Sequence, residues 1–172
     1  AHTGIGETTG FFHGFVHPVV GSDHLLAMVA VGLWAACLGG RALWSGPVVF
    51  TAAMVAGGAL AFAGMDVPFV EQGILLSVLV FGFFAAGALK LPVVYSSVLV
   101  AFFALFHGHA HGSEIPATAG AMMYTAGFAV STLLLCSVGI SLGLFFQKIG
   151  SGKLGRLIGG LIMLCGAVAS LS

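Results

Sequence analysis

Long apolar runs separated by short polar or glycine-rich breaks extend along almost the whole chain. Roughly 20 helical residues, at about 1.5 Å each, cross the hydrocarbon core of a bilayer. The approximate limits of the apolar runs are 9–39, 43–64, 67–89, 92–111, 117–147 and 153–171. The pattern predicts an all-α integral membrane protein, a bundle of about six transmembrane helices, with residues 1–172 as a single transmembrane domain.

The first run is interrupted by Pro18 and Gly21. Proline removes a backbone donor and disfavours helical geometry in the residue before it, and glycine weakens a helix interior. We therefore expect the first helix to be broken near Pro18–Gly21. Whether residues 9–20 form a separate short helix stays open at this point.

Composition supports the membrane assignment, because 59% of the residues are hydrophobic and only 6% are charged. A water-soluble domain would lack polar groups for its surface. The formal net charge is zero, which gives no electrostatic reason to expect a nucleic-acid partner. The partner that composition predicts is the lipid bilayer, and self-association into a homo-oligomer stays open.

The few charges predict the orientation in the membrane. The chain begins Ala-His without a basic, apolar leader, so we expect that a signal peptide has been removed and that the N-terminus is periplasmic. Six crossings then place all basic residues on the cytoplasmic side, as the positive-inside rule requires. These residues are Arg41, Lys90, Lys148, Lys153 and Arg156. The expected location is a bacterial inner membrane, with multiple passes and both termini periplasmic.

The seven histidines include two clusters, FFHGFVHPVVGSDH and FHGHAHGSE, which both contain the six-residue pattern FHGxxH. His13 and His17 are four residues apart, as are His107 and His111. Residues at this spacing share a helix face, so each pair can hold one metal ion. His109 points away from the face of its neighbours, and we expect it at solvent or lipid headgroups. For His13 a polar interface role is an alternative.

Asp23 and His24 lie next to the predicted break and are followed by a long uncharged run. Buried ionisable groups are costly unless each has a partner, and within a membrane they usually mark a pathway or a binding site. Broken helices at membrane depth are tolerated where they line a cavity, and they often build ion sites. We therefore predict a metal site formed by His17, Asp23 and His24 on the broken helix.

Three other residues are candidates for the same site. Glu71 opens the third run and either caps that helix or takes part in the metal path. His2 adjoins the α-amine of Ala1, and these two groups can chelate a divalent ion. Glu114 follows the second histidine cluster. The candidate metal ligands are His2, His17, Asp23, His24, Glu71, His107, His111 and Glu114.

The ligand set combines imidazole nitrogen with carboxylate oxygen and contains no thiolate. This chemistry suits Ni²⁺, Co²⁺ or Zn²⁺ better than Cu⁺, Mg²⁺ or Ca²⁺. The three cysteines are far apart and lie within apolar runs, where packing is the expected role. The residues themselves therefore indicate a divalent first-row transition metal without choosing one.

Two stretches resemble the signatures of a known family. HPVVGSDHLLAMVAVGLWA and FALFHGHAHGSEIP are similar to the two motifs of the HupE/UreJ nickel and cobalt permeases. The residues that carry the match are His17, Asp23, His24, His107, His111 and Glu114. The resemblance implies a secondary permease that imports Ni²⁺ (or Co²⁺) for hydrogenase or urease assembly, and that is not an enzyme and uses no catalytic cofactor.

Two other classes of protein stay open from the residues alone. An intramembrane zinc hydrolase could use the same ligands to activate water, although the chain has no HExxH motif. A metal exporter or sensor could also use them. The chain has no GxxxxGK[ST] motif, which argues against an ATP-driven pump within it.

Overall fold

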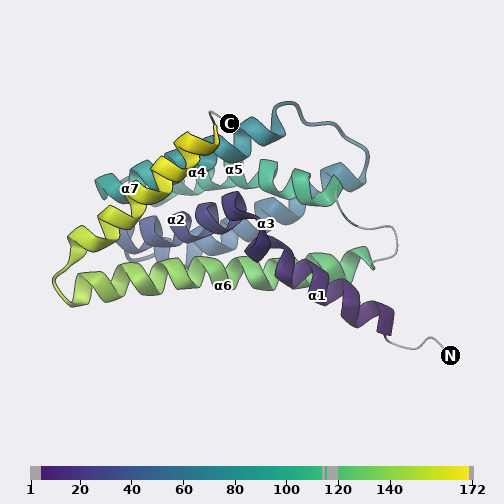
Figure 1. Ribbon diagram of the computed structural model, residues 1–172, viewed down its shortest axis with the longest axis horizontal. Coiled ribbons are helices and arrows are strands. Elements are labelled where there is room, and N and C mark those ends of the chain that lie inside the picture. Colours follow the sequence, from purple (N-terminus) through teal and green to yellow (C-terminus); the bar gives the residue numbers. More distant parts are fainter. Residues whose placement is uncertain (1–4, 114, 116–119, 171–172) are drawn as a thin grey trace.

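A computed structural model describes residues 5–113, 115 and 120–170, with side chains from residue 10 onward (Figure 1). Within these residues the chain forms seven α-helices and no strand. The helices are α1 (Ile5–Val20), α2 (Ser22–Leu38), α3 (Ala42–Phe62), α4 (Val70–Gly87), α5 (Val93–Ser113), α6 (Ala121–Lys148) and α7 (Gly152–Ala169). The predicted all-helical architecture is confirmed.

Five helices, α3 to α7, are each long and apolar enough to cross a membrane. Residues Gly10–Val20 of α1 and the whole of α2 pass the same test together, with a bend of 79° between them. The protein is therefore a multi-pass membrane protein with up to six spans, the first of them broken, as predicted. The helix continues through Pro18 and breaks at Gly21, so residues up to Val20 do form a separate helix.

The helices pack in a few extensive pairs, which Figure 1 shows running roughly along a common direction. The broken pair α1 and α2 lies along α6, α3 lies along α5, and α4 lies along α7. Glycine residues allow the backbones of paired helices to approach closely. A Cβ on Gly108 of α5, for example, would collide with the backbone carbonyl of Met54 on α3. Small residues permit this kind of contact between membrane helices.

The two ends of the bundle differ in character. Figure 1 shows the α2–α3, α4–α5 and α6–α7 connections at one end, and the start of α1 and the α3–α4 connection at the other. All five basic residues lie in the first set of connections or in the helix turns beside them. Between the ends lies an aromatic and aliphatic core that includes Trp34, Phe50, Phe81 and Met28, each at most 1% exposed. The start of α4 and the end of α5 lie toward the end without basic residues.

Candidate functional site

The break between α1 and α2 leaves Asp23 in the first turn of α2. Asp23 Oδ1 accepts a hydrogen bond of 2.8 Å from the backbone N–H of His24 and pairs with His24 Nδ1, also at 2.8 Å. A Cβ on Gly21 would lie 3.3 Å from both of these side-chain atoms, so the glycine leaves space for the pair. A carboxylate acceptor favours the proton on Nδ1, which leaves the lone pair of His24 on Nε2.

Helix α5 brings two more imidazoles to His24. The ring centroid of His24 lies 4.6 Å from that of His107 and 4.2 Å from that of His111. His107 is fully buried and His111 is 5% exposed. The two side chains thus share the face of α5 that their spacing predicts, and the His24 ring contacts both.

The last turn of α1 supplies a fourth ring. His17 is half-buried, and its ring centroid lies 4.7 Å from that of His111 and 6.0 Å from that of Tyr124 on α6. Phe128, also on α6, lies 4.1 Å from the His111 ring. His17, His24, His107 and His111 form one connected group, here called the histidine cluster, with aromatic side chains of α6 beside it.

Several nitrogens of the histidine cluster have no hydrogen-bond partner among the described residues. They are His24 Nε2, His107 Nδ1 and both nitrogens of His111. Buried polar atoms in native proteins nearly always have a partner, because an unpaired one loses hydration without compensation. Neutral imidazole has one nitrogen lone pair that can bind a metal. In these rings, no part of the described protein uses that lone pair.

A polar cavity of about 310 Å³ lies beside the histidine cluster. Its lining consists of His17, Val20, Gly21, Asp23, His24, Glu71, Ile74 and Ala110. Glu71 belongs to the first turn of α4 and is exposed, and the N-cap position of that helix makes no side-chain capping hydrogen bond. The cavity therefore combines imidazole and carboxylate groups from three helices in a space that can hold water.

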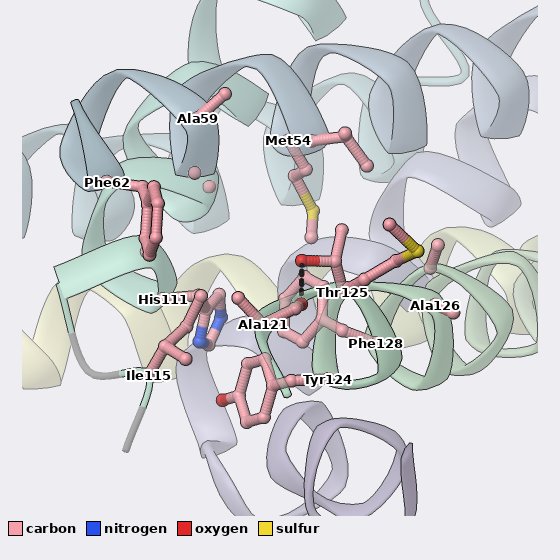
Figure 2. Close-up of a pocket in the computed structure, with 16 residues that line it drawn as sticks. Met54, Ala59, Phe62, His111, Ile115, Ala121, Tyr124, Thr125, Ala126 and Phe128 are labelled. Carbon is pink, nitrogen blue, oxygen red and sulfur yellow. Dashed lines mark hydrogen bonds between the residues drawn. The ribbon is translucent and has the colours of Figure 1, made fainter. Parts of the chain in front are cut away.

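A larger cavity of about 430 Å³ lies between α3, α5 and α6 and has a mainly apolar lining (Figure 2). Figure 2 shows Met54 and Phe62 of α3 across from Tyr124 of α6, with His111 between them. His111 lines this cavity, and its ring also contacts the two histidines that line the polar cavity. The histidine cluster therefore lies between a polar and an apolar space.

The structure brings together six of the eight predicted site residues: His17, Asp23, His24, Glu71, His107 and His111. The other two, His2 and Glu114, lie outside the described residues. His13 is exposed on α1, apart from the cluster, so the expected pairing of His13 with His17 on one ion has no support in this arrangement. His109 is directed elsewhere, since its Nε2 lies 2.8 Å from the carbonyl oxygen of Met65.

Two residues of this region were not predicted from the sequence. Ser77 of α4 contacts His107 through its Oγ, 2.7 Å from Nε2, and Tyr124 of α6 packs on His17. A serine in an apolar helix commonly bonds only to its own helix backbone. The sequence therefore contained no signal that would distinguish Ser77 from the other serines.

In their present positions, no three His, Cys, Asp or Glu side chains of the described part of the chain are grouped closely enough to hold one metal ion. The imidazoles of the histidine cluster instead contact one another mostly edge to face. The imidazole nitrogens are thus close together, but the rings would have to rotate before their lone pairs could point at one metal ion.

These features define a class: a polytopic membrane protein with a buried cluster of histidines at a broken helix. The chain matches the family model described as HupE / UreJ protein over residues 1–169. It is also 43% identical over 168 residues to Protein HupE of Rhizobium leguminosarum bv. viciae, a match that covers 97% of this chain and 87% of that protein. No solved structure matches the chain. The chain belongs to the HupE/UreJ family.

Proposed function

We propose that residues 1–172 form one transporter domain that imports Ni²⁺, or Co²⁺, from the periplasm across the bacterial inner membrane. The ion is the substrate of a secondary permease, not a catalytic cofactor, and the protein is a carrier, not an enzyme. Delivery of metal for hydrogenase or urease assembly is the role that the family resemblance implies.

One observation carries this proposal: three buried imidazoles, from two distant segments of the chain, have nitrogens without a hydrogen-bond partner among the described residues. Burial of such groups in a membrane is costly and is usually linked to a substrate or ion pathway. Imidazole and carboxylate together suit Ni²⁺ and Co²⁺, and no cysteine lines the polar cavity. We therefore assign the histidine cluster and Asp23 as the ligand region, with Glu71 at its entrance.

The charge distribution supports import. The polar cavity lies toward the end of the bundle without basic residues, and it contains the carboxylates Asp23 and Glu71. Basic residues at the opposite end favour a cytoplasmic location for that end. A cation from the periplasm would thus meet carboxylates before it meets the imidazoles. The ligands that lie outside the described residues, His2 and Glu114, belong to this proposal as well.

Release is as important as binding for a carrier. Imidazoles that must rotate to bind an ion can also return to their mutual contacts when the ion leaves. We propose that binding turns His17 and His111 toward His24, and that the apolar core on the cytoplasmic side must open before the ion proceeds.

Uptake of radioactive nickel by cells that express the protein tests this function. Substitution of His24 or His107 by Ala should abolish uptake while the protein remains folded in the membrane. His109→Ala is a matched control, because His109 is on the same helix as His107 but bonds to the Met65 carbonyl. Normal uptake in both His24→Ala and His107→Ala would refute the proposal, and anomalous scattering from crystals soaked in Ni²⁺ would locate any bound ion directly.

A further inference from the structure

Ser77 is a fully buried residue of α4 that makes two hydrogen bonds. Its hydroxyl donates to the carbonyl oxygen of Ile74, one turn earlier, at 2.6 Å. Its Oγ also lies 2.7 Å from Nε2 of His107 on α5. A serine has one hydroxyl proton, and here Ile74 accepts it. The serine oxygen must therefore accept the second hydrogen bond from an N–H at His107 Nε2.

This arrangement decides which nitrogen of His107 has the lone pair. A neutral imidazole carries one proton, so protonation at Nε2 leaves Nδ1 as the donor to a metal. His107 Nδ1 is buried and has no partner among the described residues. In the opposite tautomer, Nδ1 would be a buried N–H without an acceptor, and Nε2 would face a serine oxygen whose proton is used elsewhere. Both contacts favour the same tautomer.

We propose that Ser77 is a positioning residue of the metal site, which holds His107 in the Nε2–H tautomer so that it ligates the ion through Nδ1. The proposal rests on the proposed function for the identity of the ion. The two central ligands would then bind the ion through different ring nitrogens. His24 binds through Nε2, because its Nδ1 pairs with Asp23, and His107 binds through Nδ1. Outer partners of this kind fix ring orientation and tune metal affinity.

The contact also links α4 to the site. Glu71 at the start of α4 lines the polar cavity, and Ser77 further along the same helix holds a ligand of α5. A shift of α4 relative to α5 would therefore disturb His107 directly. This makes Ser77 a specific element of the site, distinct from the many apolar contacts between these helices.

The test combines NMR of the labelled histidine ring nitrogens with Ni²⁺ titration of the purified protein in detergent at neutral pH. The His107 signals are identified by their loss in His107→Asn. In the metal-free wild type, His107 should be in the Nε2–H tautomer. In Ser77→Ala this preference should be lost and the Kd for Ni²⁺ should rise about 10- to 100-fold. Ser77→Thr keeps the hydroxyl and should restore the tautomer.

Ser96→Ala is the matched control. Ser96 is also buried, at 4% exposure, and its hydroxyl also bonds to a carbonyl one turn earlier, that of Val93, at 2.9 Å. Its substitution should leave the His107 tautomer and the Ni²⁺ affinity unchanged. An unchanged tautomer and affinity in Ser77→Ala would overturn the assignment of Ser77. A wild-type protein that binds no Ni²⁺ would overturn the proposed function instead, and the NMR result would still decide the role of Ser77 toward His107.

Discussion

Replacement of Asp23 by Asn tests the electrostatic contribution of the carboxylate to metal binding. Asparagine keeps an oxygen that can accept from His24 Nδ1, so the ring can stay oriented while one negative charge is removed. An ion on His24 Nε2 would lie roughly 7 Å from the carboxylate oxygen, because the 2.8 Å hydrogen bond, the imidazole ring and a metal–nitrogen bond of about 2 Å separate them.

The magnitude follows from this separation. The attraction between a unit charge and a divalent ion at roughly 7 Å is about 5 kcal/mol at an effective dielectric constant of about 20. The Asp23 side chain is 31% exposed, so solvent screens it. Screening reduces the expected loss to about 1–2.5 kcal/mol, which raises the Kd for Ni²⁺ roughly 5- to 60-fold.

Isothermal titration of purified protein with Ni²⁺ in detergent measures this change. Asp66→Asn is the control, since Asp66 is an exposed carboxylate in the α3–α4 connection and undergoes the same chemical change. Its substitution should leave the Kd nearly unchanged. An Asp23→Asn protein that bound Ni²⁺ as tightly as the wild type would show that the carboxylate has no part in metal binding.

Three further predictions concern the entrance, the packing and the protonation of the site. Glu71→Gln should preserve folding but strongly reduce nickel uptake, whereas Gln72→Ala should reduce it less; normal uptake in Glu71→Gln would assign Glu71 to the helix terminus alone. Gly108→Ala should lower the free energy of unfolding by about 1–3 kcal/mol, because its Cβ would collide with the Met54 carbonyl, as thermal unfolding in detergent can measure. Gly120→Ala is its control, since a Cβ there has no neighbour within 4 Å. Ni²⁺ affinity in detergent should fall as the pH is lowered from about 7.5 to 5.5, because protons compete with the metal for imidazole nitrogens. An affinity independent of pH over this range would contradict histidine ligation.

The order of apolar and polar residues was enough to predict which segments form helices and where these helices end. Hydrocarbon cannot hydrogen-bond the backbone, so each long apolar run has to be a helix, and glycine, proline and charged residues mark where the runs end. The break near Gly21 could be predicted in the same way, as could the position of the basic residues at one end of the bundle. The i, i+4 spacing of His107 and His111 predicted their common face, and both rings do contact His24.

The same spacing does not bring both His13 and His17 to the histidine cluster. The two FHGxxH patterns are alike in sequence, but α1 ends at Val20, and it is His17 in its last turn that contacts His111. His13 lies one turn earlier and is exposed. The position at which a helix ends relative to its neighbours depends on the packed structure and cannot be predicted from helical spacing alone.

Which helices are neighbours, and therefore which side chains meet in the site, follows from how the helices pack. Lipid is as apolar as the helix surfaces, so hydropathy does not select partners; close backbone contacts such as Gly108 on Met54 do. The packed arrangement brings the last turns of α5 close to the start of α2, so that His24 meets His107 and His111. It also places Ser77 of α4 against His107 Nε2, a contact that depends on the geometry between two helices and has no counterpart in the order of residues along either one.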